Sequence, residues 1–271
     1  MKIRAICTDI DGTLLDSQRQ LSARTIAAVK SLKGIPFILA SSRMPAAMRH
    51  LQAELDILDC PLISYNGGYI VHTINATARI LESVSIPHDH CADIVAMTKG
   101  TSIHVSLYTG DAWYAPARDQ WTEREERITR VKAALRDPLH VLDQWKAERT
   151  GGHKVMCMGP ADEINTLESR LNHALGSALH IYRSRDTYLE IAPRAVSKAT
   201  AMAIVLREIY HVDMVDAMAF GDNYNDIDML AAAGFGVAVG NARPEVKAVA
   251  REITLNSIDD GVAVAIEKYC L

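Results

Sequence analysis

The feature that most constrains this chain is a short apolar segment near its start that ends in two carboxylates. Residues 3–8 are mostly apolar, which predicts a buried strand, and Asp9 and Asp11 follow it directly. Residues two apart in an extended segment point to the same side, so both carboxylates lie together. Gly12 then lets the backbone turn away. Two like charges this close favour a bound cation, and Mg²⁺ prefers oxygen ligands. The alternative is an ordinary acidic turn.

The size and composition of the chain exclude several classes of protein. Its 271 residues fit one large or two moderate domains, and 49% hydrophobic residues suffice for a full core. A net charge of −4 argues against nucleic acid or an anionic membrane surface as a partner. No apolar run approaches the roughly 20 residues of a bilayer span, and the first residues lack a cleavable signal pattern. We therefore expect a cytoplasmic protein without a nucleic acid or membrane partner.

The order of the predicted elements indicates a parallel sheet that is interrupted by an insertion. Strands and helices alternate near both ends of the chain, which is typical of a doubly wound, Rossmann-like α/β sheet with mostly parallel strands. The middle of the chain changes to helices and antiparallel strands, with a charged helix over residues 119–136 and a loop at residues 151–152. We expect a core formed by residues 1–84 and 191–271, and an inserted α+β domain formed by residues 85–190.

Polar side chains follow the other predicted strands of the core or begin the helix that re-enters it. They are Ser41, Ser42, Arg43, Asn66, Lys198, Asp222, Asn225 and Asp226. Ligands of open α/β sheets bind outside the carboxyl ends of the strands, so folding would bring these groups to the two carboxylates of the first strand. Phosphoryl transfer to a carboxylate needs such a set: a nucleophile, an acid or base, metal ligands and cations.

The motif Asp9-Ile10-Asp11-Gly12-Thr13 resembles the DxDGT signature of the haloacid dehalogenase (HAD) superfamily of phosphohydrolases. The whole chain is similar to the Cof-type branch, in which a type II α+β cap lies between the second and third motifs. The sequence Asn-Gly-Gly at residues 66–68 fits that branch as well. Ser42 and Ala199 are departures, because the branch usually has glycine at both positions. Ser42 adds a side chain where backbone amides commonly approach phosphate, which affects the phosphate geometry and not the reaction class.

The resemblance implies a chemical role for each residue of the set. Asp9 matches the nucleophile that attacks phosphorus and becomes an aspartyl phosphate. Asp11 matches the general acid that protonates the leaving oxygen and then, as a base, activates water. Ser41 matches the hydroxyl that hydrogen-bonds the phosphoryl oxygens, and Lys198 matches the cation beside the phosphate and Asp9.

The resemblance also implies Mg²⁺ as the cofactor. Its site would be formed by Asp9, Asp11, Asp222 and Asp226. Asp11 would contribute its backbone carbonyl, and Asp226 would lie behind the direct ligands. Asn225 and Ser42 would join the residues that bind phosphate, while Gly12, Arg43 and Asn66 would face the substrate cleft.

We therefore expect a Mg²⁺-dependent phosphatase that hydrolyses a small phosphorylated metabolite, such as a sugar phosphate, a nucleotide or a cofactor phosphate. The cap would select the substrate. One alternative is a sugar phosphomutase or phosphotransferase, which returns the phosphoryl group to a sugar. A second is a phospho-accepting signalling domain, which uses a similar acid cluster but lacks an insertion of this size. A non-catalytic phosphate binder should have lost Asp9 or Asp11, and both are present.

Overall fold

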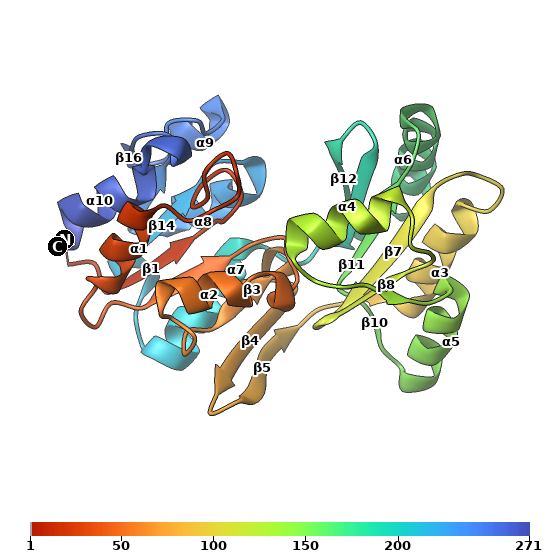
Figure 1. Ribbon diagram of the computed structural model, residues 1–271, viewed down its shortest axis with the longest axis horizontal. Coiled ribbons are helices and arrows are strands. Elements are labelled where there is room, and N and C mark those ends of the chain that lie inside the picture. The colour runs from red at the N-terminus through yellow and green to blue at the C-terminus, as the bar shows by residue number, and fades with distance from the viewer. Residues whose placement is uncertain (1) are drawn as a thin grey trace. The chain divides into compact units, whose positions relative to one another are not determined.

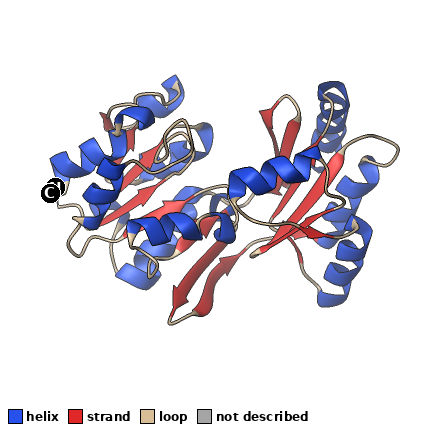
Figure 2. Ribbon diagram, in the orientation of Figure 1, coloured by secondary structure: helices blue, strands red, loops and turns tan. Residues whose placement is uncertain are grey.

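The computed structural model describes residues 2–271, and the chain divides into two compact units (Figure 1). One unit comprises the chain up to Glu82 together with Val196–Leu271, and the other is Ser83–Ala195. Figure 2 shows that each unit consists of a sheet with helices packed on it. The expected insertion of residues 85–190 falls within the second unit.

The first unit is built on an eight-stranded sheet in the order β16-β15-β14-β1-β2-β3-β4-β5. Its strands are β1 (Ala5–Thr8), β2 (Phe37–Ala40), β3 (Leu62–Ser64), β4 (Tyr69–Ile74), β5 (Thr77–Ser83), β14 (Ala217–Gly221), β15 (Phe235–Ala238) and β16 (Glu252–Ile253). The central strand β1 pairs in parallel with β2 and β14, whereas β4 runs antiparallel to β3. The register places Thr8 level with Leu39 and Phe220, so the residues that follow these strands emerge at one edge of the sheet. The expected mostly parallel α/β sheet is confirmed.

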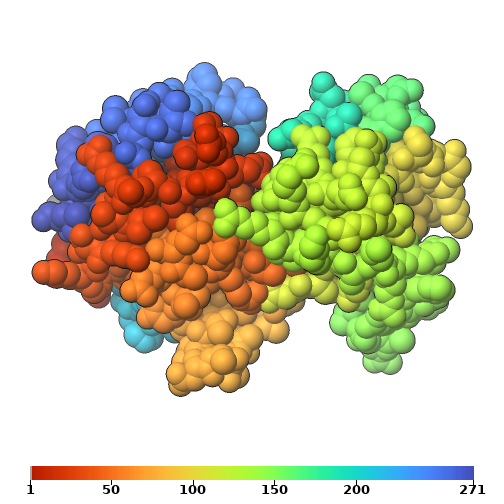
Figure 3. All heavy atoms as spheres, in the orientation of Figure 1, coloured from red at the N-terminus to blue at the C-terminus, as the bar shows by residue number. Residues whose placement is uncertain are grey.

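Helices cover both faces of this sheet. They are α1 (Ala23–Lys30), α2 (Arg49–Leu55), α7 (Lys198–Val205), α8 (Ile227–Ala232), α9 (Pro244–Val249) and α10 (Gly261–Tyr269). Figure 1 shows α1 and α2 in front of the sheet and α7 behind it. All four residues of β1 are buried, as a mostly apolar strand between two helical layers should be. The hairpin of β4 and β5 projects from the surface of this unit (Figure 3). Among residues 2–271, no helix is long and apolar enough to cross a membrane.

The second unit has a six-stranded sheet in the order β12-β13-β11-β7-β8-β9 and a short pair, β6 with β10. Its strands are β6 (Ile86–Pro87), β7 (His104–Thr109), β8 (Ala112–Ala115), β9 (Ala134–Leu135), β10 (Gly151–Gly152), β11 (Lys154–Met158), β12 (Leu179–Arg185) and β13 (Tyr188–Pro193). Its helices are α3 (His88–Met97), α4 (Gln120–Thr129), α5 (Pro138–Glu148) and α6 (Ala161–Leu175). Apolar side chains of α3, α5 and α6 form one buried core with the sheet.

Two local expectations for the second unit are wrong. The helix expected over residues 119–136 ends at Thr129, because Arg130 adopts a left-handed backbone with φ 60°. Residues 151–152, expected as a loop, form β10 and pair with β6. A Cβ atom on Gly151 would lie 1.9 Å from the carbonyl oxygen of Ile86, so glycine is what allows this close approach. This pairing joins segments that are far apart in the sequence, so no local sequence pattern predicts it.

Candidate active site

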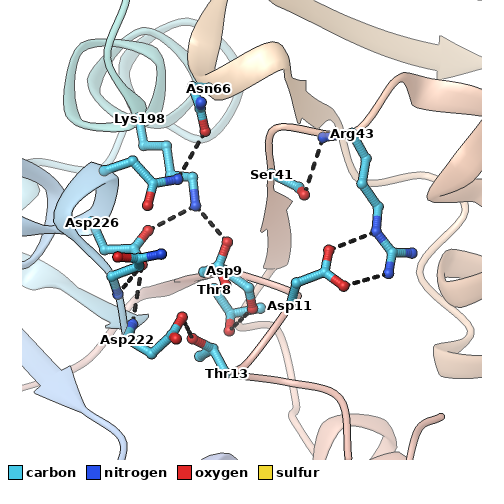
Figure 4. Close-up of polar contacts among 12 residues, drawn as sticks. Thr8, Asp9, Asp11, Thr13, Ser41, Arg43, Asn66, Lys198, Asp222 and Asp226 are labelled. Atoms are coloured by element: carbon cyan, nitrogen blue, oxygen red, sulfur yellow. Dashed lines mark hydrogen bonds and ion pairs between the residues drawn. The ribbon is translucent and has the colours of Figure 1, made fainter. Parts of the chain in front are cut away.

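The candidate nucleophile Asp9 directly follows β1 and is tied to a buried lysine (Figure 4). The Nζ atom of Lys198 lies 2.5 Å from Oδ1 of Asp9 and 2.7 Å from Oδ1 of Asp226. The side chains of Lys198 and Asp226 have no exposed surface. Lys198 is the first residue of α7, and Ser197 caps that helix by accepting from the backbone N–H of Thr200. The helix start thus places one cation between two carboxylates.

Asp226 holds the loop that follows β14. Its Oδ2 atom accepts hydrogen bonds from the backbone N–H groups of Asp222 and Asn223, each at 3.0 Å. Gly221 permits this packing, because a Cβ atom there would lie 2.4 Å from Cβ of Asp226. Both oxygens of Asp226 therefore already have protein partners. It acts on the site by fixing Lys198 and the backbone of Asp222.

Asp222 lies against the turn that follows Asp11. The hydroxyl of Thr13 donates to Oδ1 of Asp222 at 3.0 Å. Gly12 has φ +86°, and a Cβ atom on it would lie 2.5 Å from Oδ2 of Asp222. Glycine is thus required here for its backbone angle and for the space it leaves. The motif after β1 and the loop after β14 are in direct contact through these residues.

The acidic residues of the site fit a divalent cation. One carboxylate oxygen from each of Asp9, Asp222 and Asp226 can be chosen so that all three lie within 4.8 Å of one another. Three carboxylates beside the single ammonium of Lys198 leave a surplus of negative charge. Oxygen ligands of this kind suit Mg²⁺. Because both oxygens of Asp226 are engaged, Asp9 and Asp222 are the side chains that would hold the ion.

The pKa values of the cluster reflect its burial and its crowding of charge. Burial and the neighbouring charge of Asp226 raise the pKa of Asp222 to about 6. Burial also raises the pKa of Asp9, with Lys198 acting against the shift and Asp226 and Asp222 adding to it. For Lys198, burial disfavours the ammonium, but the charges of Asp226 and Asp9 outweigh it and raise the pKa. The lysine is therefore a permanent cation in this site.

The side chain of Asp11 lies apart from this cluster and is bound by arginine. Nε and Nη2 of Arg43 donate to its two oxygens, each at 2.7 Å, and Nη1 of Arg19 lies 3.7 Å from Oδ1. Burial favours the neutral acid, but the hydrogen bonds and charge of Arg43, with the charge of Arg19, outweigh it and lower the pKa of Asp11. Arg43, which we expected to face the substrate cleft, thus makes a specific contact with Asp11.

Ser41 and the segment after β3 form the remaining side of the site. The Oγ atom of buried Ser41 accepts from the backbone N–H of Arg43 at 3.2 Å, and its carbonyl accepts from the N–H of Asn66. The side-chain amide of Asn225 donates to Oδ1 of Asn66 at 3.0 Å. Asn66 has a left-handed backbone with φ 56°. Ser42 is half-buried beside Ser41. Ser41, Asn66 and the cluster of Lys198, Asp222 and Asp226 therefore lie around Asp9 at one edge of the sheet (Figure 4).

Two residues of the site, Arg19 and Asn241, were not predicted from the sequence, and Thr13 was named only as part of the DxDGT motif, without a role. The side-chain amide of Asn241 donates to the carbonyl oxygen of Gly12 at 2.7 Å. The position of Asn241 could have been predicted, because it closely follows strand β15, whose carboxyl end lies at the same edge of the sheet as that of β14. Arg19 lies in a polar loop, where nothing in the sequence distinguishes it from a solvated arginine.

Comparison with known proteins assigns the family. Residues 6–266 match the model of the haloacid dehalogenase-like hydrolase family. The chain is a haloacid dehalogenase-like hydrolase. The resemblance drawn from the DxDGT motif is confirmed, and so is the phosphatase class of enzyme that it implies.

Similar proteins cover nearly the whole chain. A Haemophilus influenzae protein named "Putative phosphatase" is 30% identical over 99% of this chain and 98% of its own length. A Shigella flexneri protein named "HMP-PP phosphatase" is 26% identical over 90% of this chain and 87% of its own length. Among solved structures, a haloacid dehalogenase-like hydrolase from Bacteroides thetaiotaomicron has a TM-score of 0.88 and 28% identity, covering 98% of this chain and 99% of its own.

Proposed function

We propose that this enzyme is a Mg²⁺-dependent phosphatase of small phosphorylated metabolites, and that it works through an aspartyl phosphate on Asp9. The observation that carries the proposal is the contact of one buried ammonium with two carboxylates, Lys198 with Asp9 and Asp226. Lys198 engages Oδ1 of Asp9, so Oδ2 is the oxygen for attack on phosphorus in line with the leaving group.

The residues around Asp9 would stabilise the charge that develops on the phosphoryl oxygens. Lys198 supplies a fixed positive charge. Ser41 accepts a hydrogen bond from the backbone of Arg43, so its own hydroxyl proton is available to a phosphoryl oxygen. The side-chain amide of Asn225 would add a second donor. When bound by Asp9 and Asp222, Mg²⁺ would reduce the repulsion between the attacking carboxylate and the phosphate.

Asp11 would move the protons of the reaction. It would protonate the leaving oxygen when Asp9 attacks, and it would take a proton from the water that hydrolyses the aspartyl phosphate. Arg43 holds its carboxylate in a fork geometry and favours the ionised form, which suits the second half of the reaction. In the first half, Asp11 must carry a proton, so it must loosen its contact with Arg43.

The substrate class rests on the relatives and on the domain organisation. A similar protein is named HMP-PP phosphatase, which supports a small phosphorylated metabolite as substrate. We assign substrate selection to the second unit, Ser83–Ala195, as the cap of this family branch. The net charge of −4 favours no polyanionic partner, and we place the enzyme in the cytoplasm.

The test is hydrolysis of p-nitrophenyl phosphate by the full chain with Mg²⁺, with EDTA, and with Mg²⁺ added back after EDTA. We expect turnover that EDTA abolishes and Mg²⁺ restores, and no turnover by Asp9→Asn. Asp143→Asn, an exposed position of α5, is the matched control and should keep wild-type activity. A screen of phosphorylated metabolites then follows.

Other outcomes of this experiment would contradict the proposal. Metal-independent turnover, or full activity of Asp9→Asn, would exclude the proposed nucleophile and cofactor. Transfer of the phosphoryl group to an added sugar in preference to water would identify a phosphotransferase. A stable phosphoprotein without turnover would identify a signalling domain.

A further inference from the structure

Asn241 connects the nucleophile motif to a distant loop, and it belongs to none of the motifs described above. It follows β15, the neighbour of β14 in the sheet, within the loop of residues 239–243. Its Nδ2 atom donates to the carbonyl oxygen of Gly12 at 2.7 Å, and its Oδ1 atom accepts from the backbone N–H of Ser257 at 2.7 Å. Both ends of the amide are thus engaged with main-chain groups.

These two contacts require an amide. The carbonyl of Gly12 needs a donor, and the N–H of Ser257 needs an acceptor. An asparagine supplies both at fixed separation, whereas an aspartate supplies only acceptors and an aliphatic side chain supplies neither. The bond to the backbone of Ser257 fixes which end of the amide faces Gly12.

The Gly12–Thr13 segment contacts both oxygens of the Asp222 carboxylate. A peptide unit is planar and trans, so fixing the Gly12 carbonyl also fixes the direction of the following N–H and of the Thr13 Cα. The hydroxyl of Thr13 donates to Oδ1 of Asp222, and the Cα of Gly12 packs beside Oδ2. A rotation of this peptide would therefore move both contacts of the Asp222 carboxylate.

The loop that carries Asn241 also holds Asp222 from the other side. The backbone N–H of Arg243 donates to the carbonyl oxygen of Asp222 at 3.0 Å, and the N–H of Val239 donates to that of Gly221 at 3.3 Å. The same short loop thus contacts the turn after β1 and the loop after β14. These are the two segments whose carboxylates, Asp9 and Asp222, would hold the ion.

We propose that Asn241 is a positioning residue for the metal site, which fixes the Gly12–Thr13 peptide and through it the carboxylate of Asp222. It does not touch the reacting atoms. The inference rests on the proposed Mg²⁺-dependent function and adds to it the group that orders one metal ligand. Removal of a group that orients a metal ligand commonly weakens metal binding by about 10- to 100-fold.

The test compares Asn241→Ala and Asn241→Asp with the wild type in two measurements. The first is Mg²⁺ binding by calorimetry without substrate, and the second is the Mg²⁺ dependence of p-nitrophenyl phosphate hydrolysis. We expect both variants to bind Mg²⁺ about tenfold more weakly. At saturating Mg²⁺, kcat should recover and the KM for substrate should stay unchanged. Asn172→Ala is the control, because Asn172 makes a similar amide-to-carbonyl bond within α6.

The aspartate variant separates positioning from simple electrostatics. A new negative charge near the cluster should tighten Mg²⁺ binding if charge alone matters, and should weaken it if donation to Gly12 matters. Tighter binding by Asn241→Asp, or unchanged binding by Asn241→Ala, would overturn the positioning role. If a variant fails to fold, Asn241→Ser tests the same loss with a smaller change. A wild-type protein that does not bind Mg²⁺ would overturn the proposed function as well, which distinguishes the two failures.

Discussion

Arg43 and Asp11 form a bidentate ion pair, with Nε and Nη2 of the arginine each 2.7 Å from one oxygen of the carboxylate. The arginine is nearly buried, at 8% exposure, and its Nη1 also donates to the carbonyl of Ala47. A planar fork of this kind fixes the orientation of a carboxylate as well as its charge. The residue assigned to proton transfer is therefore held by a rigid partner that belongs to the loop after β2.

Replacement of Arg43 should impair the steps that need Asp11. Arg43→Lys keeps the charge but loses the fork, so we expect kcat to fall about tenfold, and Arg43→Met should lower it about 100-fold, within the range that acid–base groups contribute. The measurement is kcat for p-nitrophenyl phosphate and for an alkyl phosphate. Arg43 favours the ionised Asp11 that acts as the base on the shared aspartyl phosphate, so kcat should fall by a similar factor for both substrates. A loss confined to the alkyl phosphate, whose leaving oxygen needs the protonated acid, would contradict this role.

Gly12 tests the contact between the two acidic segments. In Gly12→Ala, the new Cβ would lie 2.5 Å from Oδ2 of Asp222, so we expect Mg²⁺ affinity and activity to fall by at least about tenfold. Gly34→Ala is the matched control, because Gly34 also has positive φ, at +72°, but no atom lies within 4 Å of its Cβ position. It should cost about 1 kcal/mol of stability and leave Mg²⁺ affinity unchanged. Similar Mg²⁺ affinities in both variants would show that backbone strain, and not Asp222, explains the effect.

Lys198 is expected to stabilise the fold as well as the reaction. Lys198→Met would leave buried Asp9 and Asp226 without their cation, and breaking a buried pair costs about 3–5 kcal/mol. Urea unfolding followed by circular dichroism measures this loss. Lys99→Met, at an exposed position in the turn after α3, should change the free energy of unfolding by less than about 0.5 kcal/mol. A Lys198→Met protein as stable as the wild type would mean that the carboxylates take up protons without cost.

His153 makes the second unit sensitive to acid. Its Nδ1 accepts from the backbone N–H of Gly110 at 3.0 Å, so the buried ring is neutral, and burial lowers its pKa to about 4. The unfolded ring has a pKa of about 6.5, so between these values the unfolded chain binds the extra proton. The neutral His153 ring therefore contributes to the free energy of unfolding. This contribution, about 3 kcal/mol in total, is complete above pH 6.5 and is lost as the pH falls toward 4.

The difference between pH 7 and pH 4.5 in urea unfolding checks this prediction. Tryptophan fluorescence is the suitable signal, because all three tryptophans lie in the second unit. The wild type should lose more stability on acidification than His153→Gln does. His173→Gln, at an exposed position of α6, should behave as the wild type. An acid sensitivity that His153→Gln leaves unchanged would assign it to other groups.

The sequence predicted the parts of this protein that depend on local pattern. Apolar runs located β1, β2 and β14, and polar residues at their ends located Asp9, Ser41 and Asp222, because parallel strands bring their carboxyl ends to one edge. The chemical roles of these residues came from the family resemblance. Contacts between distant segments could not be predicted from local pattern. The bond of Asn241 to Gly12 spans 229 positions, and the pairing of β10 with β6 depends on the space that Gly151 leaves.

Two further features show why partners are harder to predict than positions. The carboxylates of Asp9 and Asp11 were expected to lie together, with only the backbone carbonyl of Asp11 at the metal. The side chain of Asp11 instead turns to Arg43, because an arginine fork satisfies both of its oxygens. Asp226 was expected behind the direct metal ligands. It lies in the acidic cluster with Asp9 and Asp222, and Lys198 and two backbone N–H groups occupy its oxygens. Spacing in the sequence places a carboxylate at the end of a strand, and the surrounding packing decides what it binds.

The most direct test of the account is a search for phosphate on Asp9. The variant Asp11→Asn should accept the phosphoryl group from p-nitrophenyl phosphate but should hydrolyse the intermediate slowly, because it lacks the base for the second step. After an acid quench, peptide mass spectrometry should find one phosphoryl group on the peptide that contains Asp9. The double variant, which carries both Asp9→Asn and Asp11→Asn, should have none on that peptide. A phosphoryl group on another residue, or rapid turnover of p-nitrophenyl phosphate by Asp11→Asn without any phosphorylated peptide, would contradict Asp9 as the nucleophile.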